Sequence, residues 1–176
     1  MITIEDITAA FAEAVRTSPH NYVSEQMALA PEDVGKRLYD DPIIAIGYAD
    51  DPLWDKLKEP QAVGAIFRTP KQWMPQGRCV VSYFAPFSDY VVEGNRADNV
   101  VVGNGWLYAR VEGQAFLTEI NHFLEQWFES QGVTALSPYA SDKFKYVFEA
   151  GSCDDIADKS LSFKSNWSER HVACVC

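Results

Sequence analysis

The sequence predicts a mixed fold of the α/β or α+β class, with helices and strands packed in layers. Apolar residues recur at helical spacing over residues 3–16 and 106–129. Between these segments, the apolar runs Ile43–Tyr48 and Cys79–Phe84 are typical of strands. The chain of 176 residues suits a single domain over residues 1–176, because domains commonly contain about 100–200 residues.

The first helix is predicted over residues 3–16 because the segment has both a cap and an apolar stripe. Thr3 caps this helix, and Asp6 lies three residues later as a capping-box partner. A second short helix is predicted over Ala30–Leu38, because Pro31 and the acids that follow it suit a first turn. The stripe of the first helix consists of Ile4, Ile7, Phe11 and Ala14.

The middle of the chain combines strands with long connections. Residues 50–77 contain four prolines, so we expect a long loop with one helical turn near Trp54–Leu57. A loop of that length suits a lid or pocket wall, and it equally suits a surface loop. Cys79–Phe84 is expected to be covered on both faces, because its apolar residues do not alternate with polar ones. Residues 88–105 are polar and are predicted to form a loop.

The C-terminal part is predicted to contain one long helix and several shorter elements. The helix covers Trp106–Glu129 and ends at Gly132, a residue type that suits a C-cap. The predicted shorter elements are strands over 133–136 and 144–150, an acidic loop over 151–160, and a last helix that begins within 165–176.

The charge of the chain argues against binding to nucleic acid. The sequence has 25 acidic and 15 basic residues, a net charge of −10, and much of the excess lies within residues 1–60. Proteins that bind nucleic acid neutralise phosphates with clustered Lys and Arg, and no stretch of the sequence is basic. Nucleic acid is therefore not expected as a partner.

The N-terminus and the cysteines favour a cytoplasmic location. Residues 1–15 carry acids and no positive region, so they do not resemble a signal peptide. No apolar run approaches the roughly 18 residues of a membrane span, so no membrane partner is expected. The four cysteines lack the spacing of a disulfide framework, and Cys174-x-Cys176 alone is a weak metal motif. We therefore expect free thiols and no metal site within the chain.

Two segments concentrate chemically active side chains at a helix start. In the segment 106–114, Tyr108 could supply a proton and Arg110 could hold an anion. In the segment 165–173, Ser165 or Asn166 can cap the helix, and the exposed helix amides and Arg170 together suit an anionic group. Both segments also fit a structural role, as a helix entry packed by aromatic residues and as an ordinary capping box.

Three segments resemble the epoxyqueuosine reductase-like iron–sulfur proteins. Asn166–Ala173, with the sequence N-W-S-E-R-H-V-A, resembles the stretch that precedes a glycine-rich turn in that family. Leu107–Arg110 is similar to the L-Y-A-R that opens a helix there, and Val80–Pro86 is similar to a strand that ends near a proline. The resemblance covers roughly residues 40–176.

The resemblance implies an oxidoreductase whose corrinoid-binding domain has a layered, nitroreductase-like fold. Cobalamin is the implied cofactor of this domain, and a ferredoxin-like module with two [4Fe–4S] clusters completes such enzymes. Residues expected to act in catalysis are Tyr108, Glu112 and Arg110. Residues expected to contact the cofactor are Tyr83, Trp106, Asn166, Trp167, Arg170 and His171.

The sequence departs from the family pattern in two places. The chain has no C-x-x-C-x-x-C-x-x-x-C-P run, so we expect the domain to be incomplete at its C-terminus and the cluster module to act in cis beyond Cys176 or in trans. Gly113 stands where the family has its presumed acid, with Glu112 next to it. In addition, the net charge of −10 fits a tRNA substrate poorly. We therefore expect a small-molecule substrate instead of tRNA. The alternatives are a non-catalytic binding or scaffold domain of the same fold and a flavin-type reductase.

Overall fold

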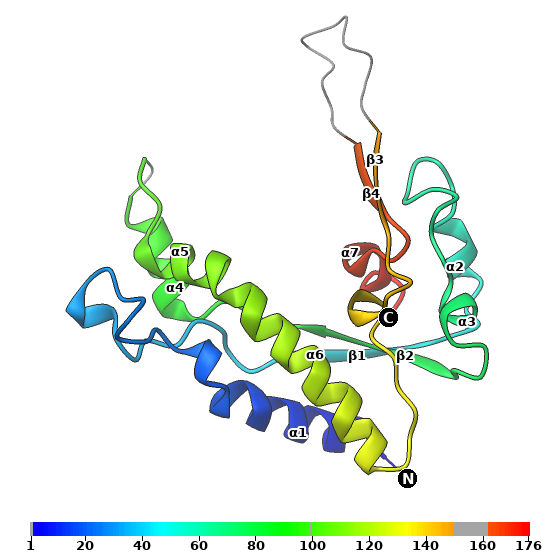
Figure 1. The fold of residues 1–176 in the computed structure, drawn as a ribbon, viewed down its shortest axis with the longest axis horizontal. Coiled ribbons are helices and arrows are strands. Elements are labelled where there is room, and N and C mark those ends of the chain that lie inside the picture. The colour runs from blue at the N-terminus through cyan, green and yellow to red at the C-terminus, as the bar shows by residue number, and fades with distance from the viewer. Residues whose placement is uncertain (1, 99, 150–161) are drawn as a thin grey trace, which may run out of the picture. The chain divides into compact units, whose positions relative to one another are not determined.

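A computed structural model describes residues 2–98, 100–149 and 162–176 (Figure 1). It contains helices and two two-stranded sheets, which confirms the mixed α+β class. The finer nitroreductase-like arrangement of layers stays a prediction. The chain divides into two compact units, where the sequence predicts one domain over 1–176. Unit 1 contains Met1–Ile44 and Tyr83–Thr134, and unit 2 contains Ala45–Ser82 and Ala135–Cys176.

Helix α1 (Ile4–Thr17) of unit 1 confirms the first predicted helix and its cap. The backbone N–H of Asp6 donates to the Thr3 hydroxyl, and the Thr3 N–H donates to the Asp6 carboxylate at 2.9 Å. These bonds satisfy amides that the first helical turn leaves without partners. The buried face of the helix consists of Ile7, Phe11, Ala12 and Val15.

The helix predicted over 30–38 is wrong. Only a 3₁₀ turn, η2 (Pro31–Asp33), forms there, after an earlier turn η1 (Pro19–Asn21). Gly35 then adopts a φ of +75°, a left-handed conformation that a continuing helix cannot contain. The residues that follow pair as isolated bridges instead, Tyr22 with Arg37 and Tyr39 with Phe87.

Helices α4 (Asp89–Arg96), α5 (Asn104–Val111) and α6 (Gly113–Ser130) form the rest of unit 1. The loop predicted over 88–105 is wrong for residues 89–96, because these residues form helix α4. The predicted helix over 106–129 is two helices, separated at Glu112, which keeps helical dihedral angles (φ −78°, ψ −24°). The weak helix-forming tendency of glycine accounts for the interruption before Gly113.

The end of α6 confirms the predicted role of Gly132. This glycine has a φ of +73°, and its N–H donates to the carbonyl of Glu129 at 2.9 Å. The N–H of Val133 donates to the carbonyl of Phe128, also at 2.9 Å. This pair of bonds is a Schellman motif, which satisfies carbonyls at the helix end. The strand predicted over 133–136 is wrong, because the segment after this cap is irregular.

The core of unit 1 joins these helices to the segment before β1. Tyr39 stacks on Phe116 with ring centroids 4.8 Å apart, and Phe11 meets the ring of Tyr83 edge to face at 4.7 Å. The buried residues of this core are Phe11, Val15, Val23, Leu38, Tyr39, Val91, Tyr108, Ala109, Phe116 and Ile120.

Strands β1 (Ile43–Tyr48) and β2 (Cys79–Phe84) pair with each other and confirm both predicted strands. The expectation that β2 is covered on both faces is wrong. None of its residues is fully buried, and Phe84 is 63% exposed. In a two-stranded sheet each strand has only one neighbouring strand. The apolar residues of β2 are therefore less covered than those of a central strand in a larger sheet.

Unit 2 contains short elements around an aromatic core. Helix α2 (Leu53–Lys56) confirms the predicted turn near Trp54–Leu57, while α3 (Pro70–Trp73) forms within the predicted loop. After the 3₁₀ turn η3 (Pro138–Ala140), strands β3 (Tyr146–Glu149) and β4 (Ser162–Ser165) pair antiparallel. The last helix is confirmed only as the four-residue α7 (Glu169–Val172). The acidic loop predicted over 151–160 lies outside the described residues.

The described helices include none that is long and apolar enough to cross a membrane. Three cysteines have free thiols: Cys79 and Cys174 are exposed, and Cys176 is partly buried.

Candidate functional site

Tyr108, the predicted proton donor, lies inside unit 1 with its hydroxyl in a buried hydrogen-bond network. The residue is 5% exposed. Its hydroxyl donates to Asp33 Oδ2 at 2.9 Å and accepts the backbone N–H of Leu29 at 2.5 Å. Burial, and then the nearby Asp33 carboxylate, raises the pKa of Tyr108. The proton is thus held on the phenol and directed at Asp33.

Asp33 is the centre of this network, although the sequence indicates only a helix-starting acid. The residue is 6% exposed, and its carboxylate also accepts the hydroxyl of Tyr90 at 2.6 Å and the amide of Asn104 at 3.0 Å. Burial by itself raises the pKa of Asp33, but the hydrogen bonds from Tyr90, Tyr108 and Asn104 outweigh it, so the pKa is lowered. An ionised carboxylate therefore holds the 31–33 turn against α4 and α5.

The other predicted residues of α5 do not share the position of Tyr108. Arg110 is exposed, and it lies two residues after Tyr108, which is more than half a turn around a helix. Glu112 is partly buried at the junction of α5 and α6, and Trp106 is partly buried against the core of unit 1. The acid, the phenol and the guanidinium therefore do not converge on one point within the helix.

Gly113 lies against the hydroxyl of Tyr39. A Cβ atom built on Gly113 would lie 2.1 Å from Tyr39 Oη, a distance that excludes any side chain without rearrangement. Tyr39 is 6% exposed and donates its hydroxyl to the carbonyl of Ala109 at 2.9 Å. Burial raises the pKa of Tyr39, while the charge of Arg110 acts in the opposite direction. A phenol thus fills the space beside Gly113, where the family that the sequence resembles has its acid.

Tyr83, at the end of β2, packs within unit 1. Its hydroxyl donates to Asn121 Oδ1 on α6 at 2.9 Å, and its ring meets Phe11. The side chain is partly buried. Both its ring and its hydroxyl therefore take part in the packing of unit 1.

Asn166, in the N-W-S-E-R-H-V-A segment, acts as a connector inside unit 2. Its side-chain amide donates to the carbonyl of Lys143 at 2.8 Å and accepts the N–H of Lys145 at 3.0 Å. Its backbone N–H donates to the carbonyl of Lys145 at 3.0 Å, and its carbonyl accepts the N–H of Arg68 at 2.9 Å. The residue is 4% exposed, so little of its surface contacts water. The prediction that Asn166 or Ser165 caps the last helix is wrong, because Ser168 is its N-cap.

Trp167 is part of the aromatic core of unit 2. It is 8% exposed and stacks on Phe67 at 5.9 Å and on Trp54 at 6.4 Å between ring centroids. Trp73 meets the same indole edge to face. A corrin or flavin could stack on the Trp167 indole only if these aromatic neighbours moved away. The packing of Trp167 therefore suits a core residue better than a direct cofactor contact.

Arg170 and His171 lie on α7 with exposed side chains. His171 Nδ1 is 2.8 Å from the hydroxyl of Ser168, the residue before the helix. Because Ser168 is the N-cap of α7, this contact holds the imidazole ring near the start of the helix. Of the four cofactor residues predicted in this segment, Arg170 and His171 are the two whose side chains are accessible to a ligand.

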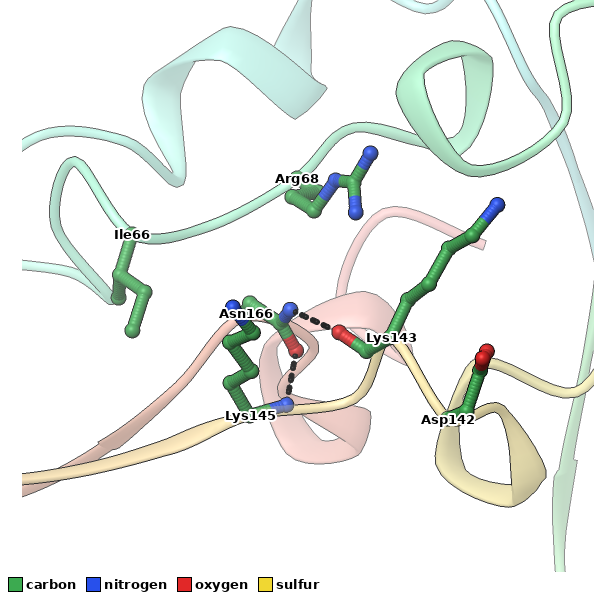
Figure 2. Close-up of a pocket in the computed structure, with 6 residues that line it drawn as sticks. All are labelled: Ile66, Arg68, Asp142, Lys143, Lys145 and Asn166. Carbon is green, nitrogen blue, oxygen red and sulfur yellow. Dashed lines mark hydrogen bonds between the residues drawn. The ribbon is translucent and has the colours of Figure 1, made fainter.

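A cavity of about 480 Å³ lies in unit 2 and is shown in Figure 2. Its lining contains three cations and one carboxylate around the connector Asn166. The residues that line it are Ile66, Arg68, Asp142, Lys143, Lys145 and Asn166. Of these residues, only Asn166 is predicted from the sequence to lie at a site. Arg68 is distant in the sequence from Lys143 and Lys145, and the hydrogen bonds of Asn166 bring their backbones together.

The nine predicted site residues fall in two groups. Tyr83, Trp106, Tyr108, Arg110 and Glu112 belong to unit 1, and Asn166, Trp167, Arg170 and His171 belong to unit 2. In the part of the chain that the structure describes, no three His, Cys, Asp or Glu side chains lie close enough to hold a metal ion. Compared with known proteins, the chain matches no family model, no curated protein and no solved structure.

Proposed function

We propose that this chain forms the substrate- and corrinoid-binding part of an epoxyqueuosine reductase-like iron–sulfur oxidoreductase. The observation that carries the proposal is the N-W-S-E-R-H-V-A segment, residues 166–173, which leads from β4 into α7. Two further segments support it, because L-Y-A-R lies on α5 and V-V-S-Y-F lies on β2. Their helical and extended conformations agree with those that the resemblance implies.

In this proposal the substrate is a small molecule. The net charge of −10 opposes binding of a tRNA, whose phosphates need many positive charges. Electrons come from an iron–sulfur module that acts in cis or in trans, since no cluster-binding cysteine run occurs within these 176 residues. The reducing cytoplasm is the proposed location, consistent with the free thiols of Cys79, Cys174 and Cys176.

Cobalamin, when bound, would supply the redox chemistry of cobalt. Arg170 and His171 are the residues that would hold polar groups of the cofactor, because their side chains are exposed. Glu112 is the acid that we favour as proton donor, because the hydroxyl of Tyr108 already donates to Asp33. Arg110 would orient an anionic group of the substrate. Asn166 and Trp167 would support the segment from within unit 2 instead of contacting the cofactor.

Retention of cobalamin by the purified chain in ultrafiltration tests this proposal. We expect retention at a stoichiometry near one, weakened by the double substitution Arg170→Ala and His171→Ala. A matched variant, Lys56→Ala on α2, removes an exposed cation elsewhere in unit 2 and should leave retention unchanged. Equal passage of cobalamin with and without protein would contradict the proposal.

A second candidate is a non-catalytic binding or scaffold domain of the same fold. The observation that favours it is the contact between Tyr39 Oη and Gly113, since an acid at that position cannot be accommodated. This candidate predicts that Glu112→Gln leaves turnover of a reconstituted reductase unchanged. A large loss of turnover in the same variant, with cobalamin retention unchanged, would favour the enzymatic candidate.

A further inference from the structure

We propose that the cavity around Asn166 is a binding site for the phosphate group of a small molecule. The inference rests on the geometry of unit 2 and is independent of the proposed corrinoid function. Three cations, Arg68, Lys143 and Lys145, line the cavity together with one carboxylate, Asp142. In a chain with a net charge of −10, such a concentration of positive charge is a local exception.

The cavity is organised by a buried side chain. Asn166 binds the backbone of Lys143 and Lys145 through its side-chain amide, and it binds the backbone of Arg68 through its own carbonyl. Figure 2 shows the two side-chain bonds and the three cationic side chains, which extend in different directions from the backbone around the amide. One residue that is 4% exposed therefore fixes the backbone positions from which all three cations extend. A ligand that meets these cations meets a preorganised arrangement, which lowers the entropy cost of binding.

The guanidinium of Arg68 is held in place as well. It lies over the ring of Trp73, with 5.0 Å between the guanidinium carbon and the ring centroid. One of its nitrogens donates to the carbonyl of Gln72 at 3.2 Å. A guanidinium has five N–H donors, so most of them remain for a ligand. Planar donors of this kind suit the oxygens of phosphate in a bidentate geometry.

Within the described part of the chain, no carboxylate forms an ion pair with these cations, Arg68, Lys143 and Lys145. Asp142, the acid in the lining, is instead contacted by the hydroxyl of Ser141. Three positive groups and one negative group leave an excess that matches a dianion. A phosphomonoester carries about −1.5 to −2 charges at pH 7, whereas a simple carboxylate carries one.

The size of the cavity also fits a small molecule. Its volume of about 480 Å³ lies within the range of about 300–1,000 Å³ that is usual for ligand pockets. Ile66 adds an apolar wall at one side of the lining. An attached organic group would have an apolar surface to contact while the cations hold the phosphate.

The test is an NMR titration of the full chain with inorganic phosphate and with pyrophosphate, at constant ionic strength. We expect saturable shifts of the backbone amides of Arg68, Lys145 and Asn166. Substitution of all three cations, Arg68→Gln, Lys143→Gln and Lys145→Gln, should weaken binding about tenfold or more, because the charge-assisted hydrogen bonds are lost.

A matched control removes the same charge from other places. The triple variant Lys36→Gln, Lys56→Gln and Arg78→Gln changes three exposed cations outside the cavity and should bind pyrophosphate as the unchanged chain does. Equal weakening in both triple variants would overturn the proposal, since net charge alone would then explain binding. Absence of saturable shifts would overturn it too, and so would binding of a short single-stranded RNA without binding of pyrophosphate.

Asn166 is a positioning residue in this site. In the variant Asn166→Ala, the three cations are kept but their backbone positions are no longer fixed by the amide. We expect weaker pyrophosphate binding together with faster hydrogen exchange at the Lys145 amide, which donates to Asn166. Faster exchange with unchanged pyrophosphate affinity would show that the amide does not organise the site.

Discussion

At the scale of single residues, the buried polar groups of unit 1 have a structural explanation. Asp33 receives hydrogen bonds from Tyr90, Tyr108 and Asn104, and each donor comes from α4 or α5. A buried carboxylate is costly unless it is hydrogen-bonded, and here three donors satisfy it. The role that the sequence suggests for Tyr108 as a proton donor therefore competes with a role in holding the fold.

Substitution Asp33→Asn tests this structural role. We expect the free energy of unfolding at pH 7 to fall by about 1–3 kcal/mol, because the amide cannot accept all the hydrogen bonds of the carboxylate. Denaturant unfolding measures the change. Glu13→Gln, which removes an exposed acid of the same unit, should change the stability little.

The same residue predicts a pH dependence. The pKa of Asp33 is lower in the folded chain than in the unfolded one, so its ionised form stabilises the fold above the unfolded pKa of about 3.9. This stabilisation is lost as the pH falls through the lowered value. Unfolding measured as the pH falls below about 5 should therefore show a smaller loss in Asp33→Asn than in the unchanged chain. Parallel profiles for the two proteins would contradict the assigned role of the carboxylate.

Gly113 gives a second prediction at this scale. Alanine in place of a helical glycine normally stabilises by about 1 kcal/mol, but overpacking in a core costs about 1–3 kcal/mol. With Tyr39 Oη at 2.1 Å from the new Cβ, we expect the overpacking cost to exceed the gain, so Gly113→Ala should lower the free energy of unfolding.

A double-mutant cycle with Tyr39→Phe isolates this contact. Removal of the hydroxyl should reduce the cost of Gly113→Ala, because the closest atom is gone. Gly94→Ala on α4 is the matched control, since nothing lies within 4 Å of its new Cβ, and it should be neutral or stabilising. The same cost of Gly113→Ala with and without the Tyr39 hydroxyl would disprove the contact.

At the scale of elements, Asn166 connects β4 to the segment before β3. Asn166→Ala removes two side-chain hydrogen bonds and leaves backbone groups of Lys143 and Lys145 without their partners. We expect a loss of about 1–3 kcal/mol in the free energy of unfolding, because the position is buried. Ser168→Ala, in the same segment, removes only the contact to His171 and should cost less. Equal losses in the two variants would contradict the connecting role.

The elements that could be predicted from the sequence are those that depend on residues close together in the chain. The cap at Thr3, the apolar runs of β1 and β2 and the glycine after α6 each depend on a few neighbouring residues, and all are found. Helix α4 was missed because its glycine and polar residues resemble a loop. The helix predicted over 30–38 failed because tertiary hydrogen bonds to Asp33 hold a turn instead.

The candidate site was less predictable than the fold. Helical spacing already separates Tyr108 from Arg110, so burial of one and exposure of the other follows from the sequence. The cationic cavity depends on Arg68 and Lys143 coming together through Asn166, residues separated by long stretches of chain. No local pattern contains that information.

At the scale of the whole molecule, the excess of acidic residues sets the electrostatics. The chain has 25 acids and 15 bases, so like-charge repulsion opposes the folded state at low ionic strength. Ion pairs offset this only slightly, because a pair such as Arg96 with Glu93 is exposed and such pairs contribute at most about 1 kcal/mol.

Ionic strength should therefore change the stability in a defined direction. We expect the midpoint of thermal unfolding to rise as NaCl increases from about 0.01 M to 0.15 M, where the screening length falls to about 8 Å. The measurement is a melting curve followed by circular dichroism. A midpoint that falls over this range would mean that attractive pairs outweigh the repulsion of the net charge.

The central claim is that this chain binds a corrinoid, and the visible absorption spectrum of cobalamin tests it most directly. Cobalamin is titrated with the purified chain, and the spectrum is recorded at each addition. We expect a saturable spectral change that reaches its plateau near one cobalamin per chain. A spectrum that stays unchanged at excess protein, while the chain remains folded by circular dichroism, would contradict it.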